Sequence, residues 1–300
     1  MFSGALTALI TPFRDGEVDV EALETMVEHE IGSGIHGLVP CGTTGETPAL
    51  AEKEDRTVIE TVVRVANGRV PVVAGTGSNS TESAIKYTRM AQEAGADGSL
   101  QVAPYYNKPT QQGLYRHFSE IAASTDLPII LYNIPGRTSV TISAETTARL
   151  AEIPNIVGTK EATHSMDMTS DIRRMCGSEF SILSGDDSLT LPIMALGGNG
   201  VISVAANVAP GAMSDLVTAL RSADASEIDR GRALHYELLP LFRALFLETN
   251  PIPVKTAASL IGLCSDEMRL PLEPLSGENL ARMQEALESM PHLLPAPEQA

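Results

Sequence analysis

The stretch Ile156-Val157-Gly158-Thr159-Lys160-Glu161-Ala162 is an apolar, strand-like run that ends on a single lysine just before a polar turn. Side chains of a strand alternate between its two faces, so Lys160 should share a face with Gly158, where we expect open space. An amine in a confined, poorly hydrated place loses solvation of its charged form, which lowers its pKa and favours the neutral form that attacks carbonyls. Lys160 is therefore a candidate nucleophile. Taken alone, such a residue is more often a surface lysine with its charge in solvent, and the case for Lys160 depends on the residues around it.

Short apolar, β-branched runs recur along the chain, at intervals of roughly twenty to thirty-five residues. Several are nearly continuous rather than alternating, which is typical of parallel strands covered by helices. The segments between them have helical spacing, and eight alternations of strand and helix predict an α/β fold, the (β/α)8 TIM barrel. The expected strands cover residues 5–10, 37–40, 70–74, 99–103, 128–133, 156–160, 180–184 and 201–204.

Helices are expected between these runs and again after the last of them. Asp19 is a candidate N-cap for the first helix, and residues 52–66 and 81–94 have the spacing of two more. No further strand is expected from about residue 225 onward. We therefore predict a TIM barrel catalytic domain at residues 1–224 and a C-terminal helical domain at residues 225–300, with helices at 235–246, 253–261 and 276–290 and a frayed tail at 295–300.

The charge and composition argue against several classes of function. A formal net charge of -17 would repel nucleic acid and anionic membrane surfaces, so we expect neither as a partner. The uncharged stretch at 188–214 is broken by glycines and prolines, which predicts a buried helix, turn and strand rather than a membrane span. The three cysteines are scattered and the N-terminus lacks the parts of a secretory signal, so a cytoplasmic location fits best.

Polar groups follow the expected strands at the end where TIM barrels place their reactive groups. Tyr132 closes the fifth strand and should point into the barrel mouth, one strand away from Lys160. A phenol relayed through hydroxyls, such as those of Thr43 and Tyr106, can carry protons to and from the intermediates of lysine–carbonyl chemistry. Each of these three residues alone has a structural alternative, because tyrosines are often buried with a hydrogen-bonded hydroxyl and threonines often fill turns.

Two places are candidates for binding carboxylates. Gly42 and Gly45 let the backbone of the GTTGE loop approach a ligand, which would leave Thr44 and nearby amides free to hold a small carboxylate. Arg137, on the loop after the fifth strand, could clamp a second carboxylate through a two-pronged contact. The alternative for Arg137 is a surface ion pair.

The sequence gives no sign of a cofactor or metal. Its six histidines show no metal-ligand spacing, and neither HExxH nor a P-loop pattern occurs. Gly75-Thr76-Gly77 follows the third strand, but Ser80 stands where a dinucleotide fingerprint has its third glycine. Asp186 and Asp187 are adjacent at a strand end, so they should face opposite ways and not share a magnesium ion. We expect no organic cofactor and no metal dependence.

Several segments, in this order and spacing, resemble the dihydrodipicolinate synthase family, which belongs to the pyruvate-dependent class I aldolase barrels. The resemblance runs from the N-terminus to about Lys255. The segments are GTTGE at 42–46, PYYNKP at 104–109, LYNIPGRT at 131–138, GTKEA at 158–162, SGDD at 184–187, GGNGVIS at 197–203 and ETNPIPVK at 248–255.

The resemblance implies a reaction and a role for each candidate residue. Lys160 would form a Schiff base with pyruvate, with Tyr132, Thr43 and Tyr106 as the proton relay. The enamine would attack L-aspartate 4-semialdehyde, and cyclisation would release 4-hydroxy-tetrahydrodipicolinate on the route to diaminopimelate and lysine. A homotetramer of tight dimers is also implied, in which Tyr106 crosses into the neighbouring subunit's site. The implied binding residues are Thr44 and main-chain groups near Gly185 and Ile202 for pyruvate, and Arg137 for the second substrate.

Two other functions deserve comparison with this one. N-acetylneuraminate lyases and sugar-acid aldolases share the lysine, the tyrosine and the GxTGE loop, but they generally lack the arginine that is Arg137 here. A non-catalytic barrel that only senses pyruvate or lysine would not need Lys160 and Tyr132, and both are present.

Feedback inhibition by L-lysine is doubtful. Lysine-inhibited bacterial members carry a histidine and a glutamate where this chain has Asp55 and Ser83, and Glu52 replaces another histidine, although Asn79 and Tyr105 match.

Overall fold

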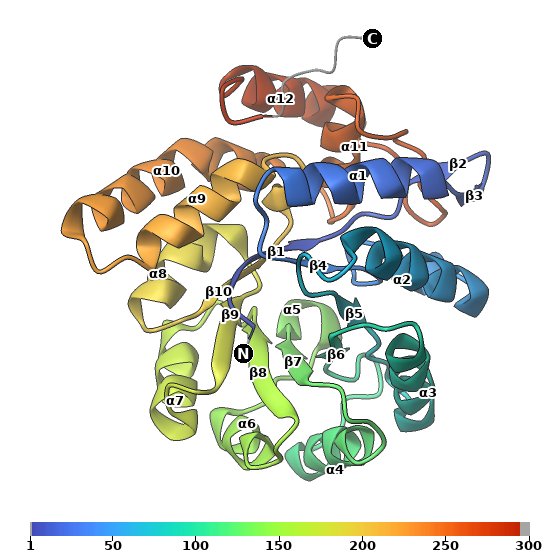
Figure 1. Cartoon of the computed structure of the whole chain (residues 1–300), viewed down its shortest axis with the longest axis vertical. Coiled ribbons are helices and arrows are strands. Elements are labelled where there is room, and N and C mark those ends of the chain that lie inside the picture. Colours follow the sequence, from blue (N-terminus) through green and yellow to red (C-terminus); the bar gives the residue numbers. More distant parts are fainter. Residues whose placement is uncertain (1, 295–300) are drawn as a thin grey trace.

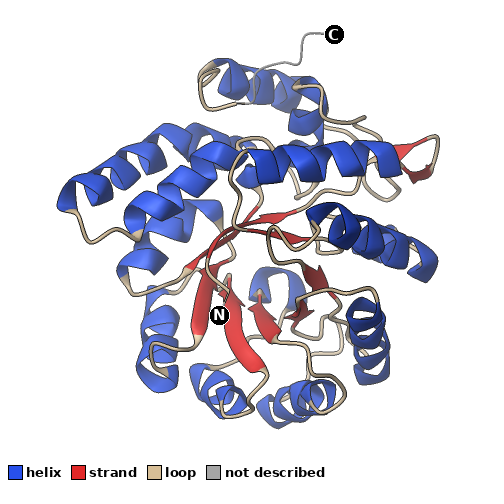
Figure 2. Ribbon diagram, viewed as in Figure 1, coloured by secondary structure: helices blue, strands red, loops and turns tan. Residues whose placement is uncertain are grey.

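A barrel of eight parallel strands, surrounded by helices, forms the centre of the computed structural model, which describes residues 2–294 (Figure 1, Figure 2). The strands follow the order β4-β1-β10-β9-β8-β7-β6-β5, and a parallel bridge between Leu38 and Val72 joins the two ends of this order. The predicted TIM barrel is therefore confirmed. Its strands are β1 (Gly4–Ala8), β4 (Gly37–Val39), β5 (Val73–Gly75), β6 (Gly98–Val102), β7 (Ile129–Asn133), β8 (Ile156–Glu161), β9 (Ser181–Ser184) and β10 (Gly200–Ser203).

Each barrel strand leads into a helix on the outside of the ring (Figure 1). Asp19 caps the first of them as predicted, because its carboxylate accepts a hydrogen bond from the Ala22 amide at 3.1 Å. The barrel helices are α1 (Val20–Gly32), α2 (Glu52–Ala66), α3 (Thr81–Glu93), α4 (Gln111–Ala122), α6 (Ala144–Ala151), α7 (Met166–Cys176), α8 (Thr190–Ala195) and α9 (Pro210–Leu220), with the single turn α5 (Pro135–Thr138) after β7. None of the helices in residues 2–294 is long and apolar enough to cross a membrane.

A short hairpin between β1 and α1 was not predicted from the sequence. β2 (Phe13–Arg14) and β3 (Glu17–Val18) pair antiparallel around Asp15 and Gly16, both of which have positive φ. Asp-Gly is the preferred pair for a two-residue hairpin turn, because both of its positions need φ above zero. The dipeptide was therefore a signal, but two-residue strands carry no hydrophobic alternation to support it.

The prediction of open space at Gly158, beside Lys160, is wrong. A side chain at Gly158 would meet the main-chain oxygen of Ser181 at 2.6 Å and its Cβ at 2.7 Å. The missing side chain lets β9 approach β8 closely, so the glycine serves strand packing rather than a cavity. The space at Lys160 arises one layer higher, where the strands end.

The C-terminal helices are α10 (Ala225–Ala244), α11 (Ile252–Leu260) and α12 (Gly277–Glu288). Helix α10 begins ten residues before the predicted 235, because its first half is mostly polar and shows no apolar stripe. These helices gather at one side of the barrel (Figure 1) and share a buried apolar cluster with β1, α1 and α9. The predicted tail at 295–300 lies outside the described residues.

Candidate active site

A cavity of about 500 Å³ opens at the C-terminal ends of the barrel strands. Its lining includes five of the residues proposed from the sequence, which come from the ends of three strands, β4, β7 and β8: Thr43, Thr44, Tyr132, Arg137 and Lys160. Gly185, a sixth, also lines it. Reactive groups of TIM barrels collect at this face, because the loops that follow all eight strands meet there.

Lys160 lies on β8 and is 5% exposed. Its Nζ is 4.4 Å from the centroid of the Tyr132 ring. The pKa of Lys160 is lowered to about 8, mainly by burial and to a smaller extent by the nearby Arg137 charge, while Asp187 and Asp186 oppose the shift. The side chain is therefore the desolvated amine, with an increased neutral fraction, that the sequence reading anticipated.

Tyr132 is the direct neighbour of Lys160 across the β7–β8 pair. Burial raises the pKa of Tyr132 to about 12, although Arg137 and a hydrogen bond from Thr43 reduce the shift. The phenol therefore carries its proton at neutral pH and is linked to the Thr43 hydroxyl. This arrangement brings an amine, a phenol and a hydroxyl together, as a proton relay requires.

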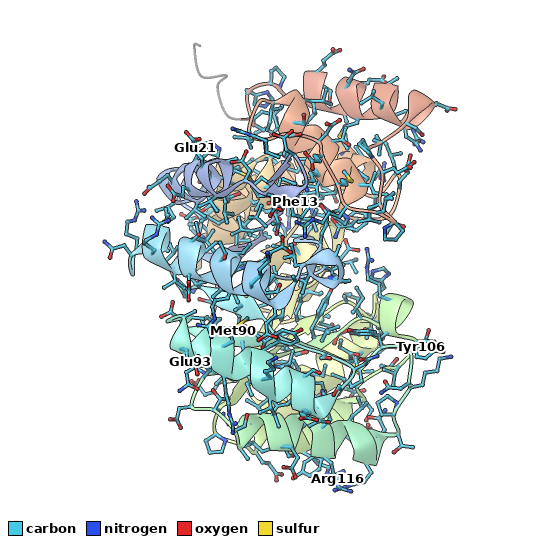
Figure 3. All side chains as sticks on the ribbon, turned by 90° about the vertical axis from the view of Figure 1, so that its right-hand side faces the viewer. Phe13, Glu21, Met90, Glu93, Tyr106 and Arg116 are labelled. Carbon is cyan, nitrogen blue, oxygen red and sulfur yellow. The ribbon has the colours of Figure 1, made fainter. Side chains whose placement is uncertain are left out.

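Tyr106 is not near Lys160 within the chain. Its side chain is 89% exposed and lies at the outer edge of the molecule (Figure 3), on a backbone with φ of 71°. The cavity is lined instead by its neighbour Tyr105. A role for Tyr106 in this chemistry therefore requires a second chain.

The GTTGE loop is held in a strained, closely packed conformation. Cys41, directly before the loop, and Glu46, its last residue, both have φ of 56°, and a Cβ at Gly75 would lie 2.1 Å from the Cys41 carbonyl oxygen. Nothing lies within 4 Å of the Cβ position at Gly42, so a ligand can approach the backbone there. Burial raises the pKa of the Cys41 thiol well above its usual value, so this side chain is packed rather than reactive.

The C-terminal segment contacts this loop, which the sequence reading did not anticipate. The Glu46 carboxylate accepts from Lys255 Nζ at 2.6 Å, and both side chains are fully buried. The Thr44 hydroxyl, which is 4% exposed, accepts from Asn250 Nδ2 at 3.0 Å. Both partners lie in ETNPIPVK, so the segment was recognised but not its contacts with the loop.

Arg137 is exposed at the rim and donates from Nη2 to the Asn250 carbonyl oxygen at 2.8 Å. A guanidinium held by a main-chain carbonyl keeps its other donors free for a ligand. Its charge acts on both Lys160 and Tyr132, which shows that it stands close to the reactive pair. The surface ion pair considered as an alternative is not its observed contact.

Gly185 and Ile202 differ in their relation to the cavity. Gly185 donates its amide to the Glu161 carbonyl oxygen at 2.8 Å, and a Cβ on it would meet Lys160 Cε at 3.3 Å. A larger residue at 185 would therefore clash with Ala162, whose Cβ would be 2.7 Å away, and press on the Lys160 side chain. Ile202 is fully buried in the barrel interior, beside Leu6, and its side chain does not line the cavity.

Asp186 and Asp187 face opposite ways, as predicted from their adjacency. Asp187 is buried and accepts from Ser203 Oγ at 2.6 Å, whereas an Asp186 oxygen lies 3.2 Å from His164 Nε2. Burial raises the pKa of Asp187 to about 6. No group of three metal-ligating side chains occurs among residues 2–294.

The lowered pKa of Lys160 gives a pH prediction. Below about 8 the amine is mostly charged, so the rate of imine formation with a carbonyl compound should rise roughly tenfold per pH unit and then level off above this value. Single-turnover trapping of pyruvate with borohydride measures that rate. A rate that still rose tenfold per unit above about pH 9 would mean that Lys160 behaves as an ordinary, solvated lysine.

Comparisons with known proteins agree with this geometry. A family model described as the Dihydrodipicolinate synthetase family matches residues 1–290. The 4-hydroxy-tetrahydrodipicolinate synthase of Thermodesulfovibrio yellowstonii is 53% identical over 289 residues, which cover 96% of this chain and 98% of that protein.

Two solved structures are also similar. The crystal structure of dihydrodipicolinate synthase from Aquifex aeolicus has a TM-score of 0.94 at 51% identity, covering 98% of this chain and 100% of that one. The chloride-inhibited dihydrodipicolinate synthase from Acinetobacter baumannii, complexed with pyruvate, has a TM-score of 0.93 at 44% identity, covering 96% and 99%.

Proposed function

This chain belongs to the dihydrodipicolinate synthetase family, and from that premise we propose how its residues carry out the reaction. The enzyme condenses pyruvate with L-aspartate 4-semialdehyde through a lysine Schiff base, in diaminopimelate and lysine biosynthesis. The observation that carries the assignment of roles is the buried Lys160 amine beside the Tyr132 phenol at the mouth of the barrel.

Lys160 is the nucleophile in this proposal. Its neutral amine attacks the ketone carbon of pyruvate, and Tyr132 delivers the proton with which the carbinolamine hydroxyl leaves as water. Loss of a methyl proton from the imine then gives an enamine, with the imine nitrogen as the electron sink. Thr43 connects Tyr132 to the rest of the relay, which Tyr106 of a neighbouring subunit completes.

The two carboxylates of the substrates are held by different parts of the rim. Thr44, with main-chain groups near Gly185 and Ile202, holds pyruvate at the base of the cavity. Arg137, which stands higher on the rim, holds the carboxylate of the semialdehyde, whose aldehyde carbon is attacked by the enamine. The amino group of the semialdehyde then closes the ring and releases Lys160. No organic cofactor and no metal take part.

The choice between synthase and lyase is tested by substrate. The protein should turn over pyruvate with L-aspartate 4-semialdehyde and leave N-acetylneuraminate uncleaved, because Arg137 suits a short carboxylate-bearing aldehyde. A higher kcat/KM for N-acetylneuraminate cleavage would overturn the proposal. Absence of imine formation with pyruvate would instead favour a protein that only senses its ligand.

Replacing Arg137 by alanine should separate the two substrates. The variant should still trap pyruvate on Lys160, because Thr44 and the amine are untouched. Its kcat/KM for the semialdehyde should fall about ten- to a hundredfold, since a charged hydrogen bond is worth roughly 1.5 to 3 kcal/mol. Arg149→Ala, which removes an arginine stacked on Tyr115 away from the cavity, is the matched control. Unaltered semialdehyde kinetics in Arg137→Ala would contradict the role.

L-lysine should inhibit turnover weakly or not at all. Asp55 and Ser83 line the cavity where sensitive relatives carry a histidine and a glutamate. Burial raises the pKa of Asp55 to about 7, so near neutral pH this carboxyl is only partly ionised and attracts an ammonium group less. A titration of the steady-state rate with L-lysine checks this. Inhibition at micromolar L-lysine would contradict it.

The assembly, location and domain division are further parts of the proposal. An exposed Tyr106 at the rim supports a homotetramer built from tight dimers, in which this tyrosine enters the neighbouring site. The acidic charge and the scattered cysteines support a cytoplasmic protein. The start of α10 at Ala225 supports a catalytic barrel at 1–224 and a helical domain at 225–300.

A further inference from the structure

Asn250 joins the two substrate subsites but has no role in the mechanism described so far. It lies at the cavity wall, two residues before the start of α11, and is 6% exposed. Its side-chain amide donates to Thr44 Oγ1 at 3.0 Å, and its carbonyl oxygen accepts from Arg137 Nη2 at 2.8 Å. One residue of the C-terminal segment therefore contacts both groups that are proposed to hold carboxylates.

The direction of the Asn250–Thr44 hydrogen bond decides where the Thr44 proton points. Because the amide donates, it occupies a lone pair of the hydroxyl and leaves the hydroxyl proton for another acceptor. Pyruvate's carboxylate offers only acceptors, so a hydroxyl that presents its proton is the form that binds it. The Oδ1 end of Asn250 is buried and has no hydrogen-bond partner among residues 2–294.

The backbone around Asn250 is fixed firmly enough for such a role. Five residues later, Lys255 is buried against Glu46 at 2.6 Å and stands 4.0 Å from the centroid of the Phe13 ring. Phe13 itself lies between α1 and the C-terminal helices (Figure 3). The segment 250–255 thus holds the GTTGE loop at two points, Thr44 and Glu46, and their spacing is set by buried contacts.

We propose that Asn250 is a positioning residue for both substrates. Its side-chain amide turns the Thr44 hydroxyl proton toward the pyruvate carboxylate, and its main-chain carbonyl holds Arg137 over the second subsite. The inference rests on the function proposed above. It makes the C-terminal segment part of the binding site rather than an addition to the barrel.

Variants of the Asn250 side chain test the role of its amide toward Thr44. They leave the main-chain carbonyl that contacts Arg137 in place. Asn250→Asp has the same shape but can only accept, so it should take the Thr44 proton and raise the pyruvate KM about ten- to a hundredfold. Asn250→Ala leaves Thr44 free to rotate and should raise it only about threefold to tenfold. The KM for the semialdehyde should change less than about threefold in both, because the bond to Arg137 comes from the main chain. Borohydride trapping gives the pyruvate concentration for half-saturation without the second substrate.

A double-mutant cycle separates positioning from charge or packing. In a Thr44→Val background there is no proton to direct, so Asn250→Asp should add less than about twofold to the pyruvate KM. Its full effect in that background would mean direct repulsion or packing, and would overturn the inference. A smaller rise of the pyruvate KM in Asn250→Asp than in Asn250→Ala would overturn the inference as well. If the Asp variant does not fold, the same cycle with Asn250→Ala decides.

Two controls keep this test apart from the test of the function. Asn279→Ala removes a comparable amide hydrogen bond, to Glu248 at 2.9 Å, on α12 and should leave both KM values unchanged. If the unaltered protein does not trap pyruvate, the proposed function fails. If it does, and the Asn250 variants match it, only the inference about Asn250 is overturned.

Discussion

Lys160→Ala is expected to trap no pyruvate under borohydride and to lose at least about a thousandfold in turnover, because the covalent nucleophile is gone. In the unaltered protein, the same reduction should add the reduced pyruvyl mass to the peptide that contains Lys160. The desolvated amine beside Tyr132 is the physical reason, since only a neutral amine forms the imine. Peptide mass spectrometry after reduction measures the site, and a steady-state assay measures the rate.

Lys86→Ala is the matched control, because this lysine is exposed and its contact is a surface ion pair with Glu52. It should leave trapping and turnover unchanged, since such pairs contribute little. Labelling only at Lys53, Lys86, Lys108 or Lys255 would refute the role of Lys160. Treatment with EDTA should not alter the rate, and restoration of a chelated sample by metal would count against the imine mechanism.

Tyr106→Phe should severely impair turnover, yet regain activity when mixed with Lys160→Ala. In a mixed dimer, one site combines an intact Lys160 from one chain with an intact Tyr106 from the other, while the second site lacks both. Equal mixing gives half mixed dimers, so the mixture should approach roughly a quarter of the unaltered activity. The reason is geometric, because Tyr106 is 89% exposed at the outer edge of the molecule (Figure 3) and does not line the cavity of its own chain. The experiment is dissociation and reassociation of the two variants, followed by a steady-state assay.

Subunit exchange must be confirmed by mass before the activity is interpreted. Activity that stays at the mean of the two parents, after confirmed exchange, would place Tyr106 in its own chain's chemistry or outside the reaction. Mixing Lys160→Ala with Tyr132→Phe is the control, because Tyr132 and Lys160 are neighbours within one chain. The sites of that mixed dimer each lack one group, so no activity should return.

The order of strands and helices could be predicted from the sequence because each is a local property. Short β-branched runs separated by helical spacing specify eight strand and helix alternations, and the strand ends carry polar side chains. Parallel closure of such a barrel puts all strand ends at one face. The proximity of Lys160, Tyr132 and Thr44 could therefore be predicted from the sequence, and the structure places the three residues around one cavity.

Other features depended on contacts between distant segments. Open space beside Gly158 was wrongly predicted because Ser181, which fills that place, belongs to another strand. The local spacing of residues does not tell which side chain lies on the neighbouring strand. The distance of Tyr106 from its own Lys160 follows from the path of a loop, which no periodicity describes.

The sequence by itself determined the fold and the family and singled out Lys160 as the candidate nucleophile, because these follow from local pattern and from short motifs. Only the tertiary structure decided how the binding groups are held. Asn250 lies more than two hundred positions from Thr44 along the chain, and Lys255 is as far from Glu46. Hydrogen bonds across such separations form only when the C-terminal helices pack on the barrel, and the ionic pair is stable there because burial removes competing water.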